Sequence, residues 1–250
     1  MSKVRIKIVT LGHMPAHFNK NKIANCESIL FEINNVIDDY PLTCDSDIPD
    51  YWAFSDNLIS AQLPSCNDAD ILIAITSVPL QYDWYLRRLN ENKVVFTFHM
   101  VKDLLKNENI PLENVVYRVL YASSLTYKGS GDRAPSYDDI LGFMHDETKG
   151  CLFDMNGLKT DLIESCDKPI ICKDCEHKLS TRKIPTNLIE TVKKELKGIR
   201  KTRYYRWADF IKSHPIISLA ISLFSVVLFG VLSSVIASIL YDKFIKNWFV

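Results

Sequence analysis

The densest group of residues that could bind a metal ion lies in one stretch, 138–178. Cys172 and Cys175 form a Cys-x-x-Cys pair, and Cys151 precedes them. Two thiolates separated by two residues can chelate one ion from a single tight turn, and two more ligands from a preceding loop complete a tetrahedral site. The spacing therefore predicts a structural Zn²⁺ site that uses Cys151, Cys172 and Cys175.

The fourth ligand is left open by the spacing. Cys166, His145, Asp146 and His177 all lie close enough along the chain to complete the site. A redox pair is one alternative, but no Trp-Cys-Gly-Pro-like context surrounds the two cysteines. Ordinary buried thiols are another. We expect a reducing compartment, where metal or redox roles are common, because residues 1–10 carry charges and lack the apolar core of a secretory signal.

Two further groups of polar residues could do chemistry. His13 and His17 lie four residues apart, but Pro15 opposes a regular helix between them, so we expect loop histidines without a metal. The pair 138–139 (Asp-Asp), with Asp146 nearby, could hold a hard cation or act as acid and base. Adjacent carboxylates usually lie on a solvated surface, and this is the interpretation we favour.

The elements that must position these residues begin with apolar segments of strand length. The segment 4–11 alternates apolar and basic residues, 69–76 is continuously apolar, and 94–98 is a third strand candidate. The segment 115–127 is rich in Val, Tyr and Leu, and it reads as a fourth strand or as the start of a helix.

Segments with helical spacing separate these strands, at 22–36, 82–90 and 99–106. Strands that alternate with helices predict an α/β fold, a mixed sheet with flanking helices, which we assign to a domain of residues 1–184. An amphipathic, basic juxtamembrane helix is predicted to follow over 185–214.

The segment 215–241 contains no charged residue and is apolar or small throughout, over more than the ~20 residues that a bilayer core requires. It predicts a single transmembrane helix, with a short tail at 242–250. Basic residues gather on its N-terminal side: Lys197, Arg200, Lys201, Arg203, Arg206 and Lys212. By the positive-inside rule, residues 1–214 are expected on the cytoplasmic side of an inner (plasma) membrane.

Small residues recur along this apolar segment, at Ser218, Ser222, Gly230, Ser234 and Ser238. Such a stripe allows close approach of helices in lipid and favours a homo-oligomer, although chance produces similar stripes. The 30 Lys and Arg balance the 30 Asp and Glu, so overall charge gives no strong nucleic-acid signal. The expected partners are the lipid bilayer, further copies of the chain, and an unidentified protein or small-molecule ligand.

The residues before the cysteine pair also match part of a longer pattern. Residues 142–145 (Gly-Phe-Met-His) fit a G-x-x-H ending, and four residues separate Asp146 from Cys151. Met155 follows Cys151, and the Cys-x-x-Cys motif of 172–175 comes later. In this order the chain resembles the archaemetzincins, a branch of the metzincin zinc peptidases. That family carries H-E-x-x-H-x-x-G-x-x-H, Cys, four residues, Cys, a nearby Met and a later Cys-x-x-Cys. Asp146 stands where the family has its first Cys.

The resemblance implies a metzincin-like, zinc-stapled C-terminal part in which catalysis is lost. Counting back from His145, Pro135 and Asp139 stand at the other two histidine positions, and Ser136 stands at the glutamate position. A zinc peptidase needs three protein ligands and a carboxylate that deprotonates the bound water. The resemblance therefore implies a degenerate member, with a strand at 115–120 ahead of the former catalytic helix.

Together these patterns predict a membrane-anchored cytosolic zinc-binding module that binds or senses a ligand without catalysis, in a prokaryotic defence or stress system. One alternative is a membrane-bound zinc metalloprotease with unconventional ligands, such as His145 and Asp139 with His99 or His13. Another is an oligomerising membrane effector. A structural site alone holds one zinc ion, whereas a protease needs a second that is open to solvent.

Overall fold

A mixed sheet organises the first part of the chain in the computed structural model, which describes residues 2–34, 36–89, 92–146, 148–241 and 243. Its strands are β1 (Val4–Leu11), β2 (Phe31–Ile33), β3 (Asp38–Tyr40), β4 (Ile71–Thr76), β5 (Leu86–Arg88) and β6 (Lys93–Thr97). The order across the sheet is β2-β1-β4-β6-β5, and β3 pairs with the second half of β1. These pairings are parallel except that of β5 with β6.

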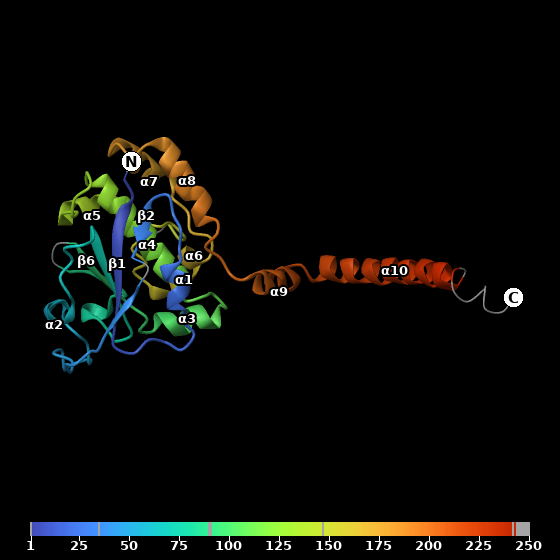
Figure 1. Cartoon of the computed structure of the whole chain (residues 1–250), viewed down its shortest axis with the longest axis horizontal. Coiled ribbons are helices and arrows are strands. Elements are labelled where there is room, and N and C mark those ends of the chain that lie inside the picture. Colours follow the sequence, from blue (N-terminus) through green and yellow to red (C-terminus); the bar gives the residue numbers. More distant parts are fainter. Residues whose placement is uncertain (1, 35, 90–91, 147, 242, 244–250) are drawn as a thin grey trace. The chain divides into compact units, whose positions relative to one another are not determined.

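Helices flank this sheet on both faces (Figure 1). They are α1 (Lys20–Ala24), α2 (Asp56–Gln62), α3 (Val101–Asn107), α4 (Glu113–Gly129), α5 (Tyr137–Phe143), α6 (Leu162–Cys166), α7 (Lys173–Thr181) and α8 (Thr186–Leu196), with the 3₁₀ turns η1 (Gln81–Asp83) and η2 (Lys159–Asp161). The predicted α/β class, a mixed sheet with flanking helices, is confirmed.

Alternate side chains of β4 divide the apolar core between the two faces of the sheet. Ile71, Ile73 and Ile75 belong to the core that contains α1, α3 and α4. Leu72 and Ala74 belong to a second core, with α2 on the opposite face. Both faces of β4 are therefore covered, which explains why its sequence is apolar at nearly every position.

Helix α4 lies where the sequence suggested a strand at 115–120. That strand prediction was wrong, and the alternative, the start of a helix, is confirmed. Val115, Val116, Val119 and Leu120 are all buried, and their i, i+1, i+4, i+5 spacing forms one face of a helix. The strand preference of Val is a weaker effect than the burial of this face against the sheet.

Two segments expected to be helical are helical only in part. Within 22–36, α1 ends at Ala24 and β2 follows; within 82–90, the end of η1 is followed by β5. Pairing with β1 and β6 gives these short segments backbone hydrogen bonds that a helix of similar length would form less stably. Asn35 and Asn90 lie outside the described residues. The short helix expected at 99–106 is present as α3.

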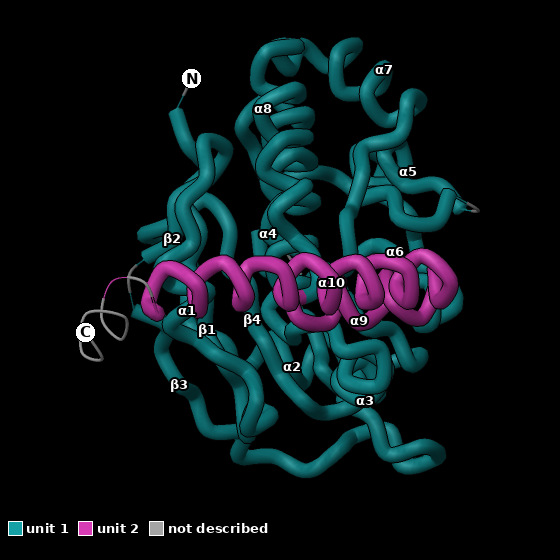
Figure 2. The backbone as a smooth tube through the Cα atoms, turned by 90° about the vertical axis from the view of Figure 1, so that its right-hand side faces the viewer, with its two compact units in different colours: residues 1–201 teal, residues 202–250 magenta. Residues whose placement is uncertain are grey.

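The chain divides into two units, residues 1–201 and 202–250 (Figure 2). Helix α8 belongs to the first unit, because Ile189, Val192 and Leu196 are fully buried in its core. The segment 185–214, expected as one juxtamembrane helix, is therefore divided between α8 and α9 (Arg203–Ser213) of the second unit.

Helix α10 (Pro215–Leu240) is the one helix of the described chain that is long and apolar enough to cross a membrane. The most apolar 18-residue segment of this helix has a mean hydropathy of 2.5, and none of it is buried. At about 1.5 Å per residue, its 26 residues extend over more than the ~30 Å of a bilayer's hydrocarbon core. The tail expected at 242–250 lies outside the described residues, apart from Lys243.

Candidate metal centre

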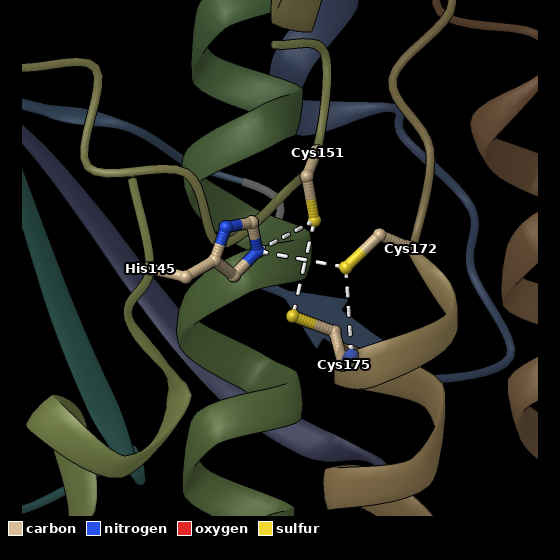
Figure 3. A group of neighbouring side chains, drawn as sticks. All are labelled: His145, Cys151, Cys172 and Cys175. Carbon is tan, nitrogen blue, oxygen red and sulfur yellow. Dashed lines mark hydrogen bonds between the residues drawn. The ribbon is translucent and has the colours of Figure 1, made fainter. Parts of the chain in front are cut away.

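The side chains of His145, Cys151, Cys172 and Cys175 converge on one point (Figure 3). One donor atom from each residue lies within 4.8 Å of the donor atoms of the others. The structure thus brings together the three cysteines that the spacing predicted. Of the four candidates for the fourth position, it places His145 beside them.

Cys172 and Cys175 are held by the first turn of α7. Cys172 is the N-cap residue, and its Sγ accepts a hydrogen bond from the Cys175 N–H at 3.5 Å. Negative charge is stabilised at this end of a helix, because free N–H groups and the helix dipole are directed toward it. The start of α7 therefore places the Cys172 sulfur where the free N–H groups of the helix are directed.

Cys151 follows a tight turn. Its N–H donates to the Thr148 carbonyl at 3.0 Å, and Gly150 between them has a φ of +82°. Glycine adopts this left-handed conformation without strain, so Gly150 permits the turn. On either side of Cys151, the Leu152 N–H donates to the Ile170 carbonyl at 2.8 Å, and the Ile170 N–H donates to the Gly150 carbonyl at 2.9 Å. These bonds fix Cys151 next to the start of α7.

His145 is placed by the end of α5 and by a short parallel bridge. Its N–H donates to the Phe153 carbonyl at 3.4 Å, and its carbonyl accepts from the Met155 N–H at 3.0 Å. Phe143 stacks on Phe153, with ring centroids 5.2 Å apart. Phe143 fits because Gly129, at the end of α4, has no side chain: a Cβ there would lie 2.4 Å from the Phe143 ring.

Three of the distances between the donor atoms are close to those around a tetrahedral zinc ion. Zn–S bonds of about 2.3 Å and Zn–N bonds of about 2.0 Å place neighbouring ligand atoms roughly 3.5–3.8 Å apart. His145 Nε2 lies 3.2 Å from Cys151 Sγ and 3.6 Å from Cys172 Sγ. Cys151 Sγ lies 3.9 Å from Cys175 Sγ. Three thiolates and one imidazole form a ligand set that zinc prefers.

The electrostatics of the cluster favour a bound cation. The pKa of Cys151 is lowered to about 5, chiefly because the Cys175 thiol donates to its sulfur, with further donation from the N–H groups of Cys172 and Phe153. The same proton, held between the two sulfurs, raises the pKa of Cys175. A zinc ion at this position would take the place of the proton that the two sulfurs share.

The other residues considered as fourth ligand lie outside this cluster. Cys166, on α6, is fully buried, and burial raises the pKa of its thiol to about 12. Asp146 and His177 are exposed. A buried neutral thiol packs as a small apolar side chain, which is the role the structure gives to Cys166.

Asp139, a weak catalytic candidate on sequence grounds, is part of a helix cap. Its carboxylate accepts from the Ser136 N–H at 2.9 Å, and the Ser136 Oγ accepts from the Asp139 N–H at 3.2 Å. The carboxylate also pairs with Arg133 at 2.9 Å and Arg182 at 3.0 Å. The Ser136 N–H, with these partners, lowers the pKa of Asp139.

We expect the substitution Asp139→Asn to lower the free energy of unfolding by about 1 kcal/mol at pH 7 without changing metal content, because it weakens a capping box outside the cluster. The pKa of Asp139 is lower in the folded than in the unfolded chain. Its contribution is thus complete above the unfolded pKa of about 3.9 and is lost as the pH falls through the folded value. Denaturant unfolding at several pH values, with metal analysis, checks this; loss of metal would contradict it.

Apart from His145, the histidines considered as metal ligands on sequence grounds do not join a metal-ligating group of the described residues. His13 and His17 are exposed, and His99 is half-buried after β6, where burial lowers its pKa. In the part of the chain that the structure describes, the cluster around Cys151 is the one group of metal-ligating side chains.

The sequence named the three cysteines and gave His145 as one of four candidates for the fourth donor, but it missed the residues that support them. The Gly150 turn had a signal, because glycine beside polar residues marks turns. The bridge between Cys151 and Ile170 had no such signal, because the two residues lie 19 positions apart and local patterns do not specify such pairing.

Comparison with known proteins adds one structural neighbour. No protein-family model and no curated protein matches the sequence. The chain is similar to a solved archaemetzincin from Methanopyrus kandleri, with a TM-score of 0.45 and 13% sequence identity, over 72% of this chain and 95% of that chain. Archaemetzincins are the family whose motif spacing residues 142–175 resemble. Similarity of this degree carries no function, so the metal centre is interpreted from its own geometry.

Proposed function

We propose that residues 1–201 form a binding module without catalytic activity, whose fold is stabilised by a structural zinc ion and which α10 anchors to a membrane. The observation that supports this is the convergence of four protein donor atoms on one point. A structural zinc site has four protein ligands, whereas a catalytic site keeps one position for water or substrate. A complete set of His145 and three cysteines therefore favours a structural role.

The position of the cluster in the fold supports the same role. Its ligands come from three separate places: the segment after α5, the turn before Leu152, and the start of α7. Among the described residues between α5 and α7, the helical elements are the short η2 and α6. One ion would tie this irregular segment to two helices, and in such sites metal binding and local folding are coupled.

The metalloprotease alternative receives less support. It requires a second, solvent-open metal site, and the residues that the structure describes contain one cluster. Its carboxylate candidate, Asp139, is engaged with Ser136, Arg133 and Arg182. Both features favour a module that binds without catalysis.

The second unit suggests how the module is attached. Basic residues and aromatic side chains alternate in α9, as in the headgroup layer beside a membrane helix. We place this side in the cytoplasm, at an inner membrane, by the positive-inside rule. The stripe that includes Ser222, Gly230 and Ser234 favours association of α10 with α10 of another copy.

Metal analysis of the full chain in detergent tests the proposal. The wild type should contain one zinc ion per chain. His145→Ala should weaken zinc binding by more than about 100-fold in a chelator competition, because loss of a direct ligand costs more than the 10–100-fold cost of a supporting group. His177→Ala, an exposed histidine two residues beyond Cys175, is the matched control and should bind zinc as the wild type does.

Two zinc ions per chain would contradict the proposal, most directly if His145→Ala removed only one of them. That result would establish a second site and favour the peptidase alternative.

A further inference from the structure

A cavity of about 150 Å³ lies beside the metal centre, between α4, α5, the β5–β6 edge of the sheet and residues 152–155. Most of its wall is apolar, including Ile71, Leu86, Val94, Ile140, Phe143 and Leu152. A cavity of this volume with apolar walls accommodates a molecule about the size of benzene. Its size and walls therefore suit a small apolar group.

One wall carries a charged side chain that is almost completely buried. Arg118, on α4, is 2% exposed and lines the cavity. Its Nη2 donates to the Asp154 carbonyl at 2.8 Å, and its Nη1 donates to the Tyr85 hydroxyl at 3.2 Å. Its Nε has no hydrogen-bond partner among the described residues. The guanidinium is thus held from two sides and still has an unused donor.

The partners of Arg118 are neutral groups. No carboxylate oxygen of a described residue forms an ion pair with it within 4.0 Å; the nearby Asp154 meets it through the carbonyl. The Asp154 carboxylate instead accepts from the Asn156 N–H at 2.8 Å. A buried charge without a counter-charge is strongly unfavourable. An anion in the cavity would supply that counter-charge.

A second guanidinium lines the same cavity. Arg88, at the end of β5, is half-buried there, and burial lowers its pKa. The lining therefore contains two arginines against the one carboxylate of Asp154. The Asp139 carboxylate acts on Arg88 in the opposite direction to burial and raises its pKa, so it is Arg118 that favours an anionic occupant.

We infer that the cavity binds a small carboxylic acid with an apolar body of about benzene size, its carboxylate facing Arg118 and its body against the apolar wall. Arginine forms strong, directional hydrogen bonds with carboxylates, and a buried pair of this kind orients the ligand. The inference rests on the proposed function, since it names the ligand class of the binding module.

The metal centre and the cavity share a wall. Met144 and residues 152–155 line the cavity, while His145 and Cys151 next to them belong to the cluster. The bridge between His145 and Asp154 joins the two segments. A zinc ion on the cluster would therefore hold the cavity wall in place without touching the ligand.

Calorimetric titration of the full chain, in lipid nanodiscs and with its zinc content measured on the same sample, tests the inference. The probe is phenylacetate, and its neutral isostere phenylacetamide is the control ligand. We expect phenylacetate to bind at least tenfold more tightly than phenylacetamide. Arg118→Met should abolish this preference, whereas Arg200→Met, which removes a charge at the far end of the first unit's sequence, should leave it unchanged.

A second variant covers the case in which Arg118→Met fails to fold. Ala122 lines the cavity one helical turn after Arg118, so Ala122→Leu fills the space without removing the guanidinium. It should weaken phenylacetate binding at least tenfold. Unchanged binding in either folded variant, or equal affinity for the two ligands, would overturn the inference. A zinc-loaded wild type that binds no phenylacetate would also overturn it, while leaving the structural zinc site standing.

Discussion

The substitution Cys175→Ser is expected to abolish zinc binding and to destabilise the segment from α5 to α7 more than any other single change in the first unit. Cys175 is fully buried, and its sulfur lies 3.9 Å from that of Cys151. A serine hydroxyl does not replace a thiolate as a zinc ligand, so the remaining thiolates and His145 lose their common cation. We expect the free energy of unfolding to fall by more than about 3 kcal/mol, part of the roughly 10–16 kcal/mol that zinc contributes in small zinc-finger peptides.

Denaturant unfolding with and without a chelator, together with metal analysis, measures this effect. The chelator should lower the unfolding midpoint of the wild type and leave that of Cys175→Ser unchanged, because the variant has no metal to lose. Cys166→Ser is the matched control: it changes an equally buried cysteine outside the cluster and should keep both the metal and the sensitivity to the chelator. Zinc retained by Cys175→Ser at the wild-type affinity would refute the structural site.

Local spacing was sufficient to predict the parts of the fold that depend on neighbouring residues. The apolar run of β4 reads as a buried strand because both of its faces are covered. Cys172 and Cys175 read as a metal pair because one helix start presents both of them. In each case the deciding geometry is contained within a few consecutive residues.

The position of His145, the fourth donor, depends on contacts between segments that are distant in the sequence. His145 reaches the cluster because residues 145 and 154 pair in one bridge and residues 151 and 170 pair in another. Cys166 is nearer to the Cys-x-x-Cys pair in sequence, yet it is directed into the core from α6. Sequence distance therefore gave no basis for choosing between them.

The reading of 115–120 as a strand concealed a second feature. If 115–120 were a strand, its successive side chains would point to opposite faces of the sheet. A single charged residue such as Arg118 would then indicate a strand at the edge of the sheet. In α4 it falls on the buried side of a helix, flanked by Val115 and Val119. The helical period would have identified it as a charge within the core, and thus as a candidate for binding an anion.

The largest expected effect in the second unit comes from placing charges in the middle of α10. Phe224 and Leu228 lie one turn apart near the centre of this helix, and the side chains of both are exposed. Arginine at the centre of a membrane helix costs about 2.5–3.5 kcal/mol on insertion scales, and the apolar contributions of Phe and Leu are lost as well. The double substitution Phe224→Arg/Leu228→Arg should therefore disfavour insertion by roughly 6–8 kcal/mol.

Alkaline carbonate extraction of membranes from expressing cells measures the insertion. The wild type should stay in the pellet, and the double-arginine variant should move to the supernatant. Phe224→Ala/Leu228→Ala changes the same two positions without adding charge, so it should stay with the membrane. Release of the wild type itself would show that α10 does not anchor the chain, and retention of the double-arginine variant would show that another segment does.

In inverted inner-membrane vesicles, protease should digest residues 1–201, because the positive-inside rule places the basic side of α10 in the cytoplasm.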